Sequence, residues 1–139
     1  MKKAFRLFLL FLLFQGTFPS CKKFVQQQEL NALVKIMTTG VWVVTNYSEN
    51  GTNITAAFSG YSFQFKSDGT VTGVNGSTIV NGTWAGDINL QTITSDFPSA
   101  GTPIDKLNAV WKITDSYVDS VAANTSINSQ TDYLSLKKH

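Results

Sequence analysis

The sequence predicts an all-β domain, an eight-stranded antiparallel up-and-down barrel with a short N-terminal helix. Three observations predict it. After Gly40, Val, Ile, Thr and aromatic residues alternate with polar ones, as in half-buried strands. Gly and Asn mark turns at short intervals, so consecutive strands should pair as antiparallel neighbours. A single meander of this length would expose two edges, and closing it into a barrel removes them.

The first 20 residues have the three parts of an export signal. Lys2, Lys3 and Arg6 precede an unbroken apolar run, Leu7–Phe14, and a short polar exit ends at Ser20. This order of charge, apolar core and small residue is typical of a signal peptide. The run is far shorter than the roughly 20 residues that cross a bilayer as a helix. We therefore expect residues 1–20 to be a signal peptide.

Cys21 is the single cysteine of the chain and follows this segment directly. Its position before Lys22 and Lys23 predicts lipid attachment, with palmitate among the acyl groups, at the outer membrane or elsewhere in the cell envelope. The alternative is an ordinary buried or free thiol in a protein that is simply secreted. In either case no second thiol is present to form a disulfide, so the domain must be held by core packing.

The charge of the chain argues against nucleic acid as a partner. The whole sequence has 11 basic and 9 acidic residues. Without Lys2, Lys3 and Arg6, eight basic residues face nine acidic ones, and no arginine remains. A domain without a basic field or arginine is poorly suited to binding phosphates.

One helix is expected before the barrel. From Lys22 to Thr39, apolar residues recur at spacings of three and four, which predicts one buried helix face made of Leu30, Leu33, Val34 and Met37. Gly40 is a candidate C-cap. The expected organisation is therefore an attachment site, tether and helix over 21–39 and a barrel domain over 40–139.

The turn signals divide the rest into eight strands. Ile54–Lys66 is either one long strand kinked at Ser59–Gly60 or a hairpin there. Ser95–Asn108 is expected to be irregular with a helical turn or two from Ile104, and Asn124–Gln130 to be a polar loop. The predicted strands are Val41–Ser48, Ile54–Lys66, Thr70–Val74, Thr78–Ala85, Ile88–Thr94, Val110–Asp115, Tyr117–Ala122 and Thr131–Lys137.

Several motifs carry a family resemblance over Met37–Lys137. They are Gly40-Val41-Trp42, Gly82-Thr83-Trp84, the runs from Phe58 to Phe65 and from Leu107 to Ile113, and Thr131-Asp132-Tyr133-Leu134. Together they resemble the lipocalin-like family of small exported lipoproteins of Gram-negative bacteria, whose functions are mostly undefined. The resemblance implies an eight-stranded antiparallel barrel or half-open barrel, with the first-strand tryptophan closing one end. Lipocalins also pack a late arginine on that tryptophan, and this chain has no arginine after Arg6.

Aromatic residues are the candidates for a ligand cavity. They can equally plug the barrel ends and fill the core, and the sequence leaves both readings open. The candidates are Trp42, Tyr61, Phe63, Phe65, Trp84 and Trp111.

Catalysis, a metal and a cofactor have little support. The only histidine is His139, at the end of the chain, and the carboxylates fall mostly in turns.

Asp119-Ser120-Val121 resembles an O-glycosylation pattern, which makes Ser120 a candidate glycan site. N-glycan acceptor patterns, which are also ordinary turn composition, occur at Asn46, Asn50, Asn53, Asn75, Asn81 and Asn124.

Two non-enzymatic functions follow. The first is an envelope lipoprotein whose barrel binds a small apolar or amphipathic ligand. The alternative is a filled barrel that serves as a structural or protein-interaction module of the envelope, with contacts through the loops Ser95–Pro103 and Asn124–Gln130.

Overall fold

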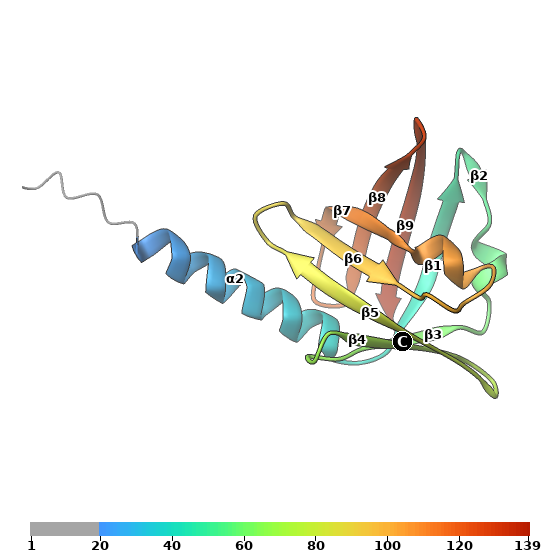
Figure 1. Ribbon diagram of the computed structural model, residues 1–139, viewed down its shortest axis with the longest axis horizontal. Coiled ribbons are helices and arrows are strands. Elements are labelled where there is room, and N and C mark those ends of the chain that lie inside the picture. Colours follow the sequence, from blue (N-terminus) through green and yellow to red (C-terminus); the bar gives the residue numbers. More distant parts are fainter. Residues whose placement is uncertain (1–19) are drawn as a thin grey trace, which may run out of the picture.

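The protein is a β-barrel with one long helix at its N-terminal side (Figure 1). The computed structural model describes residues 20–139, with side chains from residue 27, so the predicted signal peptide lies outside the described residues except for Ser20. The helix α2 spans Ser20–Thr38. No helix in the described range is long and apolar enough to cross a membrane. The strands are β1 (Trp42–Glu49), β2 (Thr52–Asn53), β3 (Ser62–Phe65), β4 (Thr70–Asn75), β5 (Thr78–Asp87), β6 (Thr92–Asp96), β7 (Ala109–Ser116), β8 (Ser120–Ile127) and β9 (Gln130–Lys138).

Eight of these strands close into an antiparallel barrel, which confirms the predicted fold class. The order around the sheet is β1-β3-β4-β5-β6-β7-β8-β9, and β9 pairs back onto β1. The closing ladder runs from Trp42 opposite Lys138 to Ser48 opposite Tyr133. The short β2 pairs with the C-terminal end of β1, at Ser48 and Glu49.

The predicted strand Ile54–Lys66 is neither one long strand nor a simple hairpin. Its first half forms the 3-10 helix η2 (Thr55–Phe58), and only Ser62–Phe65 is a strand. Burying Phe58 under the barrel end requires the chain to turn inward there. Likewise, the predicted strand Ile88–Thr94 begins late, at Thr92, because β5 continues to Asp87 and the chain turns only then.

The prediction of a polar loop at Asn124–Gln130 is wrong. β8 continues to Ile127, β9 begins at Gln130, and the two strands stay paired to their ends. Only Asn128 and Ser129 form the turn, with φ values of 51° and 66°, the left-handed pair of a tight hairpin. The polar composition misleads because the side chains of this segment alternate between the two faces of the strand. Thr125 points inward and is buried, whereas its neighbours lie on the outer face.

The meander gives the barrel two distinct ends. Turns 66–69, 88–91 and 117–119 share one end with the α2–β1 connection, and we name this the helix end. The opposite end, named the far end, carries the segment between β1 and β3, the β4–β5 and β8–β9 turns, and the β6–β7 connection with the 3-10 helix η3 (Ile104–Leu107). Figure 1 shows α2 extending away from the barrel on the helix-end side.

Trp42 joins α2 to the barrel at the helix end. Gly40 has a φ of 84°, as expected for the residue that ends the helix and turns the chain into β1. The Trp42 side chain is fully buried, and its Nε1 donates to the Met37 carbonyl at 2.9 Å. Lys138 Nζ lies 5.1 Å from the centroid of its ring. A lysine thus places a cation against the first-strand tryptophan, where the resemblance implied an arginine.

Trp42→Ala should lower the free energy of unfolding by about 3–5 kcal/mol, because it removes a fully buried aromatic side chain and leaves a cavity. Urea denaturation followed by circular dichroism measures the change. Ile79→Ala, at an exposed position, is the control and should stay within about 0.5 kcal/mol of the parent protein. Equal stability of Trp42→Ala and the parent would contradict the packing described here.

Candidate functional site

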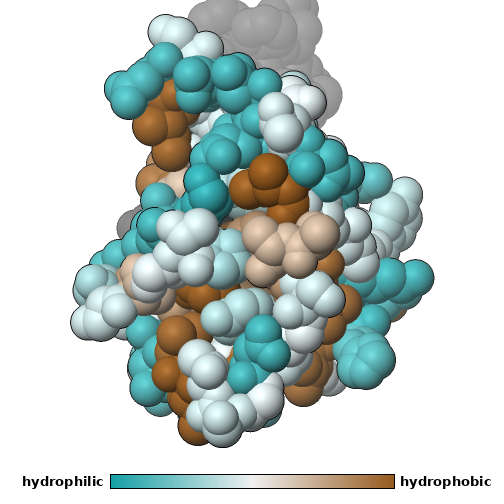
Figure 2. Space-filling view, turned by 90° about the vertical axis from the view of Figure 1, so that its right-hand side faces the viewer, coloured by the Kyte–Doolittle hydropathy of each residue, from teal (hydrophilic) through white to brown (hydrophobic). Residues whose placement is uncertain are grey.

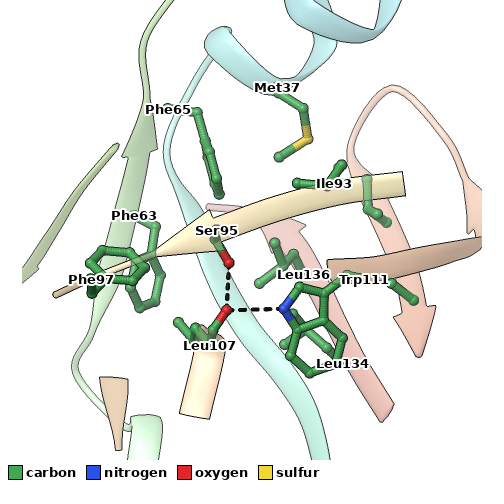
Figure 3. Close-up of a pocket in the computed structure, with 12 residues that line it drawn as sticks. Met37, Phe63, Phe65, Ile93, Ser95, Phe97, Leu107, Trp111, Leu134 and Leu136 are labelled. Carbon is green, nitrogen blue, oxygen red and sulfur yellow. Dashed lines mark hydrogen bonds between the residues drawn. The ribbon is translucent and has the colours of Figure 1, made fainter. Parts of the chain in front are cut away.

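The barrel interior is almost completely filled by side chains. A cavity of about 40 Å³ remains near its centre (Figure 3). Small-molecule sites typically measure about 300–1,000 Å³, whereas one water occupies about 30 Å³ of liquid. The cavity is lined by Met37, Phe63, Phe65, Ile93, Ser95, Phe97, Leu107, Trp111, Val121, Ala123, Leu134 and Leu136.

Three of the six predicted aromatic residues line this cavity: Phe63, Phe65 and Trp111. Trp42 and Trp84 are buried but do not line it. Tyr61 is half-buried and stacks on Phe63, with ring centroids 6.2 Å apart. The structure therefore divides the predicted set between the cavity lining and the packing around it.

Trp84 holds the β3–β4 turn at the helix end. Its Nε1 donates to the Lys66 carbonyl at 2.8 Å, and its ring meets Phe65 edge-on at 5.5 Å. The Gly82 that precedes it lies so close to the next strand that a Cβ there would collide with the Asp96 carbonyl oxygen. The second Gly-x-Trp motif is thus explained by packing.

The polar groups of the interior bind one another. The Leu107 carbonyl accepts from Ser95 Oγ at 2.5 Å and from Trp111 Nε1 at 3.0 Å, as Figure 3 shows. Within residues whose side chains are described, no buried side-chain nitrogen or oxygen lacks a partner. No interior polar group is therefore left over to orient a ligand, as specific small-molecule sites require.

The η3 segment covers the far end of the barrel. Ile104 and Leu107 are buried beneath it, and Lys106 Nζ binds Glu49 Oε1 of β1 at 2.5 Å. Tyr47, also on β1, donates its hydroxyl to the Lys106 carbonyl at 2.9 Å. Several contacts thus tie this connection to β1, and the interior is closed from this side.

Tyr47 and Phe97 are core residues that the sequence analysis did not select. Tyr47 is almost fully buried, stacks on Phe58 and meets Trp111 edge-on. Burial raises the pKa of its hydroxyl above the usual value, and the nearby Asp132 and Glu49 carboxylates raise it further. Simple alternation from Trp42 would have placed Tyr47 on the outer face, but the irregularity between Val44 and Asn46 shifts the parity of β1, and Tyr47 therefore points inward.

The wall of the barrel is open between β7 and β8 towards the far end. Pairing of these strands ends at Lys112 opposite Asn124. Continued in register, Val110 would face Ser126, but the strands separate before that point. A groove of about 420 Å³ fills the separation, and we name it the seam. It is lined by Thr92, Ala109, Val110, Lys112, Asn124, Thr125, Ser126 and Ile127.

The seam leaves strand edges without a strand partner. The Ile113 N–H donates to Gln91 on the β6 side, so alternation directs the main-chain groups of Val110 towards the seam. By the same alternation the main-chain groups of Ser126 face it from β8. Val110 and Ile127 are each about half exposed. Together they give the seam apolar margins.

The comparable gap between β1 and β3 is closed by the chain itself. These strands share only the pair Trp42 and Phe63. Beyond it, the Ile54 N–H donates to the Tyr47 carbonyl at 2.9 Å, and the Tyr47 N–H donates to Thr55 Oγ1 at 2.8 Å. The edge of β1 is therefore satisfied, which distinguishes it from the seam.

The remaining predicted sites lie away from the interior. Cys21 falls in the first turn of α2, and its side chain is outside the described residues. Ser120 begins β8 at the helix end, half-buried, and its carbonyl accepts from the Tyr117 N–H. Within the described part of the chain, no group of three or more His, Cys, Asp and Glu side chains is arranged to hold a metal ion.

Tyr47 gives the protein a pH dependence that can be measured. Because its pKa is raised in the folded state, its contribution to stability is complete below a pH of about 10 and is lost as the pH rises through the folded value. We expect the free energy of unfolding to fall above a pH of about 10, and Tyr47→Phe to remove part of that fall. Urea denaturation across this range tests it. Tyr133→Phe, on the exposed face of β9, is the control and should keep the parent's slope.

Comparison with known proteins supports the fold. No family model and no curated protein matches the chain. Among solved structures, a DUF4847 family protein from Bacteroides vulgatus is similar, with a TM-score of 0.58 and 18% sequence identity. The match covers 77% of this chain and 97% of that protein. At this identity the likeness extends to the architecture of the barrel.

Proposed function

We propose that this chain is a non-enzymatic interaction module of the cell envelope, a filled barrel attached to a membrane by lipid at Cys21. The partner would be another polypeptide, bound in extended form at the seam. The observation that carries the proposal is the open pair of strand edges in an otherwise closed barrel.

The filled interior favours a protein partner over a small molecule. A space of about 40 Å³ is well below what a typical ligand needs, and the polar groups beside it bind one another. Opening the interior would also break the contacts of η3 with β1. A partner on the outside of the barrel requires none of these changes.

The seam offers the groups that an extended peptide uses. Unpaired main-chain N–H and C=O groups on a strand edge pair readily with an added strand. Val110 and Ile127 can contact alternate side chains of such a strand, and Tyr133 lies nearby, opposite Asn124 on β8. Figure 2, which views the right-hand side of Figure 1, shows apolar residues in separate spots among hydrophilic ones. A peptide bound through its main chain does not require a continuous apolar surface.

The membrane attachment rests on the sequence. The apolar run Leu7–Phe14, the small residue Ser20 and the lone Cys21 follow the order of a lipoprotein signal. The resemblance to exported Gram-negative lipoproteins supports the same location.

A small apolar ligand remains the second candidate, favoured by the apolar lining of the cavity. Binding would have to displace η3 and alter the surroundings of Trp111. Co-purified ligand in native mass spectrometry together with a change in tryptophan fluorescence would favour it. A protein that is free of ligand would favour the interaction module.

Site-specific photo-crosslinking tests the seam. A photoreactive residue at Val110 or Ile127 should capture a polypeptide partner in cells that express the protein, because both positions border the open edges. The same residue at Ile79, which is exposed on β5, is the control. Val110→Lys with Ile127→Lys should reduce recovery of that partner by about tenfold or more, as for central interface residues. Equal crosslinking at Ile79 and at the seam would refute the assignment.

Metabolic labelling with palmitate tests the attachment. Label should be incorporated into the protein but not into Cys21→Ser, and that variant should move from the membrane to the soluble fraction. One acyl chain gives only marginal membrane binding, whereas several give stable attachment. Lys22→Ser, which leaves the cysteine in place, is the matched control. A labelled Cys21→Ser protein would contradict acylation at this residue.

A further inference from the structure

We propose that the helix end of the barrel lies against the lipid surface, with Leu90, Tyr117 and Val118 entering the interfacial layer. The inference rests on the proposed attachment at Cys21. It adds an orientation, in which a second set of contacts holds one end of the barrel to the bilayer and turns the far end away from it.

The turns of the helix end carry strongly exposed apolar side chains. Leu90, in the β5–β6 turn, is 61% exposed, and Tyr117 and Val118, in the β7–β8 turn, are 62% and 72% exposed. None of them supports a strand pair or the core. Apolar and aromatic residues at turn tips are the kind that membrane interfaces accept, because a tyrosine ring can lie among headgroups while its hydroxyl stays wet.

These turns flank the helix that leads to Cys21. A groove of about 520 Å³ lies between α2 and these turns, and Glu29, Leu33 and Ile36 of α2 line one side of it. The other side is lined by the β5–β6 turn and the end of β7, through Ile88, Gln91, Asp115 and Ser116. Figure 1 shows α2 leaving the barrel on the same side as the β5–β6 turn. The β5–β6 turn and α2 therefore lie on the same side of the barrel.

The helix length allows both contacts at once. Cys21 precedes Glu29 by eight residues of continuous helix, which is about 12 Å along the axis. The headgroup layer on each side of a bilayer is about 5–7 Å thick. If α2 is inclined to the membrane rather than perpendicular to it, the acylated Cys21 and the turn tips reach the same layer.

The charges near the two turns are of both signs. Asp87 and Asp119 border the turns, Lys112 donates its Nζ to the Leu90 carbonyl at 2.8 Å, and Lys138 ends β9 at the same end. Carboxylates at the contact are unfavourable on an anionic surface. Contact through the apolar tips should therefore occur on zwitterionic lipid as well.

Fluorescence quenching in reconstituted vesicles tests the orientation. Cys21 is the only cysteine and is blocked when acylated, so Val118→Cys and Ile79→Cys each offer one thiol for a fluorophore. Ile79 is 63% exposed and lies beside the β4–β5 turn, at the far end, which makes it the matched control. The protein is purified from membranes and reconstituted into phosphatidylcholine vesicles that contain a lipid with a nitroxide on its headgroup.

The label at residue 118 should be quenched at least about twofold more than the label at residue 79, as expected for a side chain within the interfacial layer. A label at Leu90→Cys should be quenched likewise, and should lose that quenching when Tyr117→Ser and Val118→Ser are added. Equal quenching at residues 118 and 79, or quenching at residue 90 that survives both serine substitutions, would overturn the orientation.

The proposed attachment and the proposed orientation are refuted by different results. A free thiol in the unsubstituted protein would refute acylation of Cys21, and it is detected before any vesicle is added. Weak quenching at residue 118 with Cys21 blocked would refute the orientation alone.

Discussion

The pairing of β1 with β9 is the constraint on which the rest of the molecule depends. It joins the first and last strands of the meander, so the sheet has no free long edge at its ends. Closure brings the inward side chains of all eight strands to one centre, where a single apolar core buries them. It also sets Lys138 against the ring of Trp42 and fixes the place where α2 meets the barrel.

The three tryptophans share one role within this frame. Each indole donates its N–H to a main-chain carbonyl of a connecting segment: Trp42 to Met37, Trp84 to Lys66 and Trp111 to Leu107. A buried indole thus contributes apolar area and fixes a connection at the same time. The side chains of the interior are consequently used for packing, and the strand edges without a partner lie on the outside, at the seam.

The sequence was sufficient for the fold class, because alternation and turn residues act locally and together imply a closed meander. The inward parity of Phe63 and Phe65 was predictable for the same reason. The extent of β8 was not, since Asn124 and Ser126 are polar like loop residues and become strand only by pairing with β9. Nor was the position of Phe97, an isolated apolar residue in an irregular segment that long-range packing buries.

The candidate site was less predictable than the fold. Aromatic content indicated either a lined cavity or a filled core, and the choice depends on whether side chains from opposite walls meet, which is a property of the closed barrel. The seam arises where β7 and β8 diverge while β7 stays paired with β6 and β8 with β9. Where a pairing stops depends on how segments distant in the chain meet, which no single segment reveals.

The direct passage of α2 into β1 has a mechanical consequence. Only Thr39, Gly40 and Val41 separate the helix from the strand, so tension applied at the N-terminus would be delivered to the start of β1. If the opposing pull acts on β8, near the far end, β1 and β9 would slide along each other. Hydrogen bonds between antiparallel strands lie perpendicular to that sliding, so the whole closing ladder would resist together rather than opening one rung at a time.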